Sequence, residues 1–391
     1  MMKWRHAVWS ASIPIHVQGG MHMPFITDRM RANEEKLKMS KTDDDEQMAR
    51  KMNKNQSRFI LQPEAIVEKL RNAIFGQDDV IDQIENLLRV VRVDITEPHR
   101  PLYVALFLGP TGVGKTETVR ILAQSIYGDR EALSRIDMNT LAQEHYAAAI
   151  TGAPPWYVGS KEGTTLFDEE KIKGTFSKPG IVLFDEIEKA DSTVIQSLLN
   201  VMDNGKLLIA SGDHTIDFRN SMIFMTSNLG SKEIIEYSKN DVKTKLKKYF
   251  YRLKTGNWSG ADQVILNRII KKQLEQRFSP EFLNRIDDIL VFNFINDRSV
   301  HSIIDKLTAE INKRLEKYDI ELEVTTPAKD FLITNGYDKQ YGVRALKRCI
   351  RKYLEIPLAT ILEQAHHEKK VYYTVSSDGR KLTFIQVEKE E

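Results

Sequence analysis

The sequence predicts an α/β fold with a mainly parallel sheet flanked by helices, followed by a smaller, mainly helical domain that ends in a β-hairpin. Short apolar runs recur along the chain, helical patterns lie between them, and the pattern changes after Phe294. Tyr103–Gly109 is a continuous apolar run, which is typical of a strand that is buried on both faces of a sheet. Strand-like runs recur at Ser134–Met138, Ile181–Asp185, Ser221–Ser227 and Asp288–Phe292.

The elements on either side of these strands follow from periodicity. Apolar residues recur at helical spacing between Leu61 and Asp94 with a break at Phe75-Gly76, which predicts a helix, a turn and a second helix. We therefore expect a large α/β domain at 61–294 and a small domain at 295–391. In the small domain we expect helices at Val300–Tyr318, Ala328–Asn335 and Val343–Gln364, a strand at Glu321–Val324, and a hairpin formed by VYYTV and LTFIQV.

The first 60 residues differ from the rest of the chain. Between Asp28 and Arg58 the sequence is charged, with almost no apolar periodicity, which predicts a charged arm that is either solvated or a fraying helix. The residues before this arm include Trp4 and Trp9 and are more apolar, so they could dock on a partner instead.

Composition excludes several classes of protein. The net charge of +2, from 57 basic and 55 acidic residues, gives no general attraction to nucleic acid or to an anionic membrane. The single cysteine, Cys349, cannot form an internal disulfide and agrees with a reducing compartment. The sequence holds no run of about 18 apolar residues, and polar residues such as His6 and Ser10 interrupt the N-terminal segment. We expect a cytoplasmic protein that binds neither membrane nor nucleic acid.

A phosphate-binding loop follows the first predicted strand and precedes a helix. Its sequence matches G-x-x-x-x-G-K-[ST] in full, and backbone N–H groups of such a loop close around phosphate at the helix N-terminus. Lys115 is expected to reach the β- and γ-phosphates, and Thr116 is expected to bind Mg²⁺. We expect ATP and Mg²⁺ as cofactors, and the expected nucleotide ligands are Gly109, Pro110, Thr111, Gly112, Val113, Gly114, Lys115 and Thr116.

Two carboxylates follow the apolar run IVLF, at the carboxyl end of a strand, where open α/β sheets bind ligands. Asp185 is expected to hold the Mg²⁺, and Glu186 to polarise the attacking water. Asn228, after the next apolar strand, could orient that water. Taken alone, the carboxylates could be surface charge or a helix cap, and Asn228 a turn residue. We also expect Ile74 and Phe75, before Gly76-Gln77, to bind the nucleotide.

The order of the motifs resembles the second ATPase module of the ClpA/ClpB class of AAA+ unfoldases, from about Leu61 to the end of the chain. The resemblance implies an AAA+ P-loop NTPase whose large ATPase domain is followed by a lid similar to the small domain of the second ClpB module. The motifs that carry it are GQ, GPTGVGKT, RIDM, GAPP-YVG, LFDEIEKA, DFRNSMIFMTSNLGS, SPEFLNRID and YGVRALKR.

The resemblance also implies roles for three polar residues. Asn228 matches the sensor-1 residue, Arg285 matches the arginine finger, and Arg344 matches the sensor-2 residue on the lid. An arginine finger acts across a subunit boundary, so the resemblance implies a homo-oligomeric ring, of six copies. Without the family, Arg285 and Arg344 would read as ordinary surface arginines.

A turn-rich loop, Gly152–Gly163, carries an adjacent aromatic pair. In the family this loop lines the central pore, where the residue matching Tyr157 grips an unfolded polypeptide, so Trp156, Tyr157 and Val158 are expected to bind substrate. Family members have glycine where this chain has Trp156. The alternative is that both rings pack under the loop as core. A second pore loop is expected at about Asn204–Asp213.

The resemblance thus implies an ATP-dependent remodeller that threads or pulls a polypeptide client through a ring. The alternatives are an assembly switch or scaffold that translocates nothing, and a nucleic-acid motor, which the near-neutral charge disfavours. Neither Ile-Gly-Phe nor Ile-Gly-Leu, which mark the docking loop of protease-partnered relatives, occurs in the sequence, so we do not expect ClpP as a partner. Residues 1–60 or 247–260 could dock an adaptor.

Overall fold

The computed structural model describes residues 57–142, 167–209, 214–231, 270–295, 297–338, 341–364 and 370–387. These residues fall within one compact unit that begins at Ser57. Most of the charged N-terminal arm, the aromatic residues Trp156 and Tyr157 with Val158, and the insertion 247–260 lie outside the described residues. The predictions made for them stay predictions.

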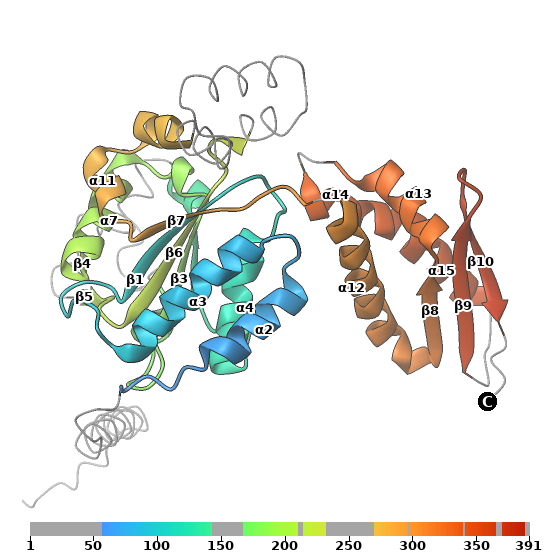
Figure 1. Cartoon of the computed structure of the whole chain (residues 1–391), viewed down its shortest axis with the longest axis horizontal. Helices are drawn as coiled ribbons and strands as arrows, with labels where there is room; N and C mark the ends of the chain where they lie inside the picture. Colours follow the sequence, from blue (N-terminus) through green and yellow to red (C-terminus); the bar gives the residue numbers. More distant parts are fainter. Residues whose placement is uncertain are drawn as a thin grey trace, which may run out of the picture. The chain divides into compact units, whose positions relative to one another are not determined.

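A five-stranded parallel sheet forms the centre of the large domain (Figure 1). The strand order is β2-β3-β6-β1-β7, and every neighbouring pair is parallel. The α/β fold class is confirmed, because each of the five predicted strand-like runs forms one of these strands. Their bounds are β1 (Tyr103–Leu108), β2 (Ser134–Asp137), β3 (Gly180–Asp185), β6 (Ser221–Ser227) and β7 (Asp288–Val291).

The three central strands β3, β6 and β1 are buried on both faces, which is why they show no polar alternation, whereas the edge strand β2 alternates buried and exposed residues. Ala105 and Phe107 of β1 belong to one hydrophobic core, while Val104 and Leu106 belong to the other. The first core includes α2 (Pro63–Ala73), α3 (Asp78–Val93) and α4 (Lys115–Tyr127), which lie together along the sheet in Figure 1. The second includes α6 (Glu169–Lys173), α7 (Ser192–Asn204), helical residues 270–277 and α11 (Pro280–Asn284).

Two further strands follow α7 and form an antiparallel pair. They are β4 (Lys206–Ile209) and β5 (His214–Asp217). Gly205, in the left-handed conformation at φ 62°, ends α7 and starts β4. The expectation of one loop over Asn204–Asp213 is therefore wrong for Lys206–Ile209, which form a strand.

The small domain contains the helices and strands predicted after Phe294. Its three-stranded sheet has the order β10-β9-β8, in which β9 and β10 form the predicted hairpin and β8 runs parallel to β9. The elements are α12 (Asp297–Leu315), η3 (Glu316–Tyr318), β8 (Ile320–Val324), α13 (Thr326–Gly336), α14 (Gly342–Ile350), η4 (Arg351–Glu355), α15 (Ile356–Gln364), β9 (Val371–Ser377) and β10 (Leu382–Val387).

The last helical segment differs from the single helix expected at Val343–Gln364. It consists of α14, a π-helical turn at Arg351–Glu355, and α15. Pro357 has no N–H to donate to the carbonyl of Tyr353, and its ring crowds that carbonyl, which favours a local widening of the helix. No described helix is both long enough and apolar enough to cross a membrane.

Candidate active site

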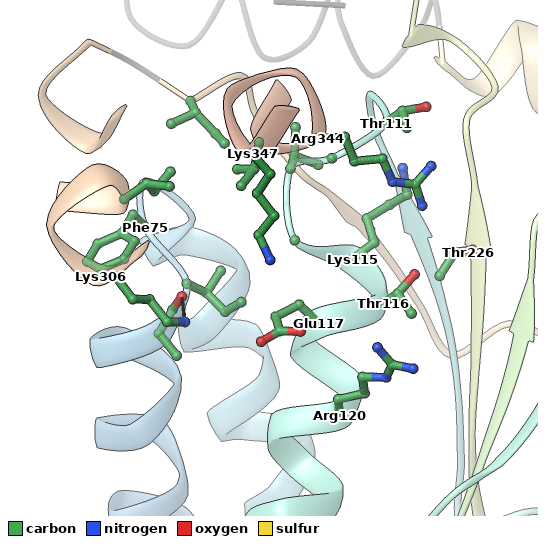
Figure 2. Close-up of a pocket in the computed structure, with 18 of the residues that line it drawn as sticks. Phe75, Thr111, Lys115, Thr116, Glu117, Arg120, Thr226, Lys306, Arg344 and Lys347 are labelled. Atoms are coloured by element: carbon green, nitrogen blue, oxygen red, sulfur yellow. Dashed lines mark hydrogen bonds between the residues drawn. The ribbon is translucent and has the colours of Figure 1, made fainter. Parts of the chain in front are cut away.

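Loops at the carboxyl ends of β1, β3 and β6 meet at one edge of the sheet, because parallel strands place these ends together. They border a cavity of about 300 Å³. The cavity is completed by the C-terminal end of α2 and by residues of α12 and α14 from the small domain. Figure 2 shows Lys115, Thr116 and Arg120 on or beside α4, with Arg344 and Lys347 reaching toward them from α14.

The phosphate loop adopts a backbone that only glycine accommodates easily. Gly112 lies at φ 78° and Gly114 at φ 111°, both in the region that side chains disfavour. A Cβ atom on Gly112 would also lie 2.6 Å from the carbonyl oxygen of Tyr341 in the small domain. α4 begins at Lys115, directly after this loop, so its N-terminal N–H groups face the cavity.

Lys115 is buried, and its ammonium group is held inside the loop. Its Nζ donates to the carbonyl oxygens of Gly109 at 2.5 Å and Pro110 at 2.8 Å, and to Oδ1 of Asn228 at 2.9 Å. Burial lowers the pKa of Lys115 to about 8, although the negative charges of Glu188 and Asp185 oppose this shift. The structure therefore brings the two sequence-predicted residues Lys115 and Asn228 into direct contact.

Asp185 ends β3 and is held by three side chains. Its Oδ1 accepts from the hydroxyls of Thr226 at 2.5 Å and Thr116 at 3.2 Å, and its Oδ2 accepts from Nη2 of Arg135 at 2.6 Å. The hydroxyl of Thr226 also accepts from the backbone N–H of Glu186 at 3.0 Å. The sequence analysis gave no role to Thr226 or Arg135.

The residues around Asp185 fit Mg²⁺. A carboxylate and a hydroxyl are the hard oxygen donors that this ion prefers, and it is commonly bound by one or two carboxylates together with substrate phosphates and water. Among the described residues, no group of three or more His, Cys, Asp or Glu side chains could hold a metal ion. Thr116 and Asp185 would therefore supply only part of the ligand set.

Glu186 follows Asp185 in a strained backbone conformation, with φ at 58°. This turn directs the chain away from β3 and leaves the carboxylate at the rim of the cavity. Its Oε2 accepts from Nδ2 of Asn139 at 2.7 Å, and Asn139 lies in the short helix η1 (Met138–Leu141) after β2. Sequence reasoning missed Asn139, which directly follows the motif RIDM.

Asn228 is fixed through its main chain as well as its side chain. Its backbone N–H donates to Oε1 of Glu188 at 3.1 Å. Arg277, from helical residues 270–277, donates to the carbonyl oxygens of Glu188 at 2.9 Å and Ala190 at 2.6 Å. These hydrogen bonds connect the segment after β3 to the end of β6, so they fix the backbone at Glu186 relative to the backbone at Asn228.

The far end of the cavity is apolar. Ile74 and Phe75, the two residues that the sequence predicted to bind nucleotide, line it just after α2, together with Ile303 and Leu307 of α12. Lys306 of α12 donates to the carbonyl oxygen of Ala73 at 3.1 Å, which connects the small domain to this wall. An apolar slot next to a cationic loop suits a planar base attached to phosphates.

The predicted arginines separate into two groups. Arg344 lines the cavity from α14, whose residue Val343 donates its N–H to the carbonyl oxygen of Gly112 at 3.2 Å. Arg285 does not line the cavity. Its Nε instead lies 2.5 Å from Oδ1 of Asp203, and its carbonyl oxygen accepts from Nη2 of Arg100 at 3.0 Å.

Comparison with known proteins shows the family to which this chain belongs. Residues 100–289 match the family model described as an AAA domain (Cdc48 subfamily), and residues 295–374 match the C-terminal, D2-small domain, of ClpB protein. A Pseudomonas aeruginosa protein named ATP-dependent protease ATP-binding subunit-like protein AmiB is 45% identical over 333 residues, which cover 84% of this chain and 88% of that protein. The chain belongs to the Clp/ClpB family of AAA+ ATPases.

Other members of the Clp/ClpB family show the same relationship. A Rhodococcus erythropolis protein named ATP-dependent protease ATP-binding subunit-like protein is 42% identical, over 74% of this chain and 80% of its own length. ClpC of Staphylococcus aureus, named as an ATP-dependent Clp protease ATP-binding subunit, is 36% identical over 85% of this chain but only 38% of its own length. The chain is accordingly an ATPase.

Proposed function

We propose that this ATPase is a protein remodeller that uses ATP hydrolysis to pull a polypeptide through the pore of a homo-oligomeric ring, of six copies. The observation that supports this best is the cavity itself, because residues of the large domain and of α12 and α14 line it together. A nucleotide that contacts both sides favours one lid position, so its hydrolysis changes the shape of the chain. Remodelling enzymes need this coupling.

The residues divide the work of hydrolysis. When bound, Mg·ATP supplies the phosphoanhydride bond and a metal-neutralised phosphate chain. Lys115 and the N–H groups of the phosphate loop would neutralise the phosphates, while Thr116 and Asp185 would hold Mg²⁺. Glu186 would accept a proton from the attacking water, which Asn228 would orient, and Arg344 would link the lid to the nucleotide.

The position of Arg285 supports a ring. It contacts Asp203 rather than its own cavity, so it would complete the site of a neighbouring copy. Arginine fingers that stabilise the transition state contribute about 10³–10⁵ in rate in the systems where they have been removed.

Substrate contact is assigned to Trp156, Tyr157 and Val158. Aromatic side chains offer a large contact area with few rotatable bonds, so they can grip many sequences. Most folded domains are stable by only about 5–15 kcal/mol, so repeated local pulls can unravel them. The client is then an unfolded or partly unfolded polypeptide.

The partner protein is a separate part of the proposal. ClpC is named as an ATP-dependent Clp protease ATP-binding subunit, and the Pseudomonas aeruginosa relative as an ATP-dependent protease ATP-binding subunit-like protein. This chain lacks the Ile-Gly-Phe and Ile-Gly-Leu tripeptides, so we propose that it works without ClpP. We also propose that it works in the cytoplasm. An adaptor would dock on residues 1–60 or 247–260.

A trapped variant tests the function directly. Glu186→Gln keeps the size and polarity of the side chain but removes the base, so the ring should bind ATP and retain its client. Crosslinking this variant in cells is expected to capture polypeptides, and adding Tyr157→Ala is expected to release them. A Glu186→Gln ring that captures the same proteins with and without Tyr157 would exclude threading and favour a scaffold.

A further inference from the structure

Asp185 has a cationic partner that no role described above requires. Arg135 donates Nη2 to Oδ2 of Asp185 at 2.6 Å, and only 11% of the Asp185 side chain is exposed. A buried carboxylate without a compensating charge is strongly destabilising. Arg135 therefore contributes directly to the positive charge that compensates Asp185, together with the Lys115 ammonium group, which also interacts with Asp185.

The sheet explains why these two residues meet. β2 and β3 are parallel neighbours, in which Asp137 pairs with Asp185 and Arg135 pairs with Leu183. Along β2, Ser134 and Ile136 are buried while Arg135 faces the open side and lines the cavity. The Arg135 side chain is 39% exposed, so it can leave Asp185 without breaking the core.

Asp185 does not depend on Arg135 for its orientation. Thr226 is buried and donates to Oδ1, while Thr116 donates to the same oxygen. The hydroxyl of Thr226 is fixed in turn by the N–H of Glu186. Removing the Arg135 charge would thus leave Oδ2 with only the 3.5 Å contact from the Thr116 hydroxyl, and the carboxylate would stay in place.

We propose that Arg135 is the counter-ion of Asp185 in the metal-free site and competes with Mg²⁺ for this carboxylate. The proposal rests on the assignment of Thr116 and Asp185 to Mg²⁺ in the proposed function. Both cations need the same buried negative charge, and two cations at one carboxylate repel each other. Arg135 therefore sets the Mg²⁺ concentration at which bound nucleotide acquires its metal.

A Mg²⁺ titration of the full chain tests this role without measuring hydrolysis. The chain is saturated with ADP, MgCl₂ is added, and the half-saturating Mg²⁺ concentration is read from calorimetry or from the unfolding midpoint. Arg135→Gln keeps a polar side chain and removes the charge, so the half-saturating concentration should fall by about tenfold.

Arg120→Gln is the matched control. Arg120 also lines the cavity, on α4 one turn beyond Thr116, but its ion pair is with Glu131 at 3.4 Å (Figure 2). We expect its half-saturating concentration to stay near that of the unchanged chain. An equal shift in both variants, or no shift in Arg135→Gln, would overturn the role of Arg135.

The Mg²⁺ titration also gives an answer if Arg135→Gln does not fold or if the unchanged chain does not respond to Mg²⁺. If Arg135→Gln does not fold, Arg135→Lys replaces it, because lysine makes a single contact where arginine offers a fork. Its half-saturating concentration should then lie below that of the unchanged chain, and an equal or higher value overturns the proposal. If the unchanged chain shows no Mg²⁺ response with ADP, the Mg²⁺ assignment itself is wrong.

Discussion

Two buried threonines show how much a single hydroxyl can matter. Thr226 donates to Asp185 and accepts from the N–H of Glu186, so both of its hydrogen-bonding functions are used. Thr308 in α12 is also buried, yet its Oγ1 has no hydrogen-bond partner among the described residues. An unsatisfied buried hydroxyl lowers stability, whereas a satisfied one supports its neighbours.

Replacing each threonine by valine should therefore have opposite effects. Thr226→Val removes one of the hydrogen bonds to Asp185, leaves the Glu186 N–H without its partner, and should lower the free energy of unfolding by about 1–3 kcal/mol. Thr308→Val removes the unsatisfied hydroxyl and should leave stability unchanged or raise it. Urea unfolding of the two variants measures the difference, and equal losses in both would contradict these hydrogen bonds.

Lys115 makes stability depend on pH. Its pKa is about 8 in the folded chain, below the usual 10.5, so between these values the unfolded chain binds more protons. Stability must then rise with pH across this window, by up to about 3 kcal/mol from this residue. Lys115→Met should remove that rise.

The measurement compares unfolding free energies of the nucleotide-free chain and of Lys115→Met from pH 7.5 to 10.5. Other titrating groups cancel in the difference, including Tyr127, whose pKa is raised to about 12 by burial. The advantage of the variant over the unchanged chain should shrink as pH rises. A pH-independent difference would show that Lys115 is not held in a desolvating site.

The residues missed by sequence reasoning have a common cause. The phosphate loop is contiguous, so its letters alone predict its role. Arg135, Asn139 and Thr226 act on Asp185 or Glu186 only because β2 and β6 are the two neighbours of β3. The strand order is set by how the whole sheet assembles, so it cannot be predicted from the motifs RIDM and MTSN.

At the scale of elements, Gln77 joins two segments that are far apart in the sequence. It is buried, its Nε2 donates to the carbonyl oxygen of Asn293 at 2.9 Å, and its Oε1 accepts from the Asn293 N–H at 2.8 Å. Asn293 lies between β7 and α12, where the large domain passes into the small one. Nearby, the hydroxyl of Tyr337 donates to the carbonyl oxygen of Ile295 at 2.7 Å.

Gln77→Ala should therefore destabilise the connection between the two domains. Both backbone groups of Asn293 would lose a buried partner, at a cost of about 1–3 kcal/mol in the free energy of unfolding. Gln124→Ala, at an exposed position of α4, is the control and should change stability by less than about 0.5 kcal/mol. If Gln77→Ala lowers the free energy of unfolding no more than the control does, the hydrogen bonds of Gln77 do not stabilise the connection between the domains.

The elements also show which features of the fold a sequence pattern can predict and which it cannot. The apolar runs predicted the buried strands, because burial on both faces leaves a local signature. The β4 strand was missed because Lys206 and Leu208 are exposed, so the segment resembles a loop. The hydrogen bonds of Gln77 to Asn293 were also missed, because nothing in the local sequence indicates a partner 216 residues away.

At the scale of the whole molecule, Arg285 should act only between copies. Arg285→Ala keeps Glu186, and Glu186→Gln keeps Arg285, so each variant lacks a different part of a shared site. Each alone should lose at least about 10²-fold in hydrolysis, and a mixture should recover part of the activity. The recovered rate is measured against the mixing ratio.

Recovery arises where an Arg285→Ala copy receives the arginine of a Glu186→Gln neighbour. Asp217→Asn is a matched control, because Asp217 at the end of β5 pairs with Arg219 much as Asp203 pairs with Arg285. Assayed alone, this variant should hydrolyse ATP at the rate of the unchanged chain, because it keeps both Glu186 and Arg285. If the two inactive variants never complement each other, Arg285 does not act in a neighbouring site.

The central claim is that ATP hydrolysis moves polypeptide past Tyr157. We would follow the fluorescence of a folded reporter protein with an unstructured tail, in the presence of ATP and a trap that prevents refolding. The unchanged chain should unfold the reporter, whereas Tyr157→Ala should leave it folded and keep its ATPase rate within about twofold. Equal unfolding by Tyr157→Ala, or no unfolding by the unchanged chain, would contradict the claim.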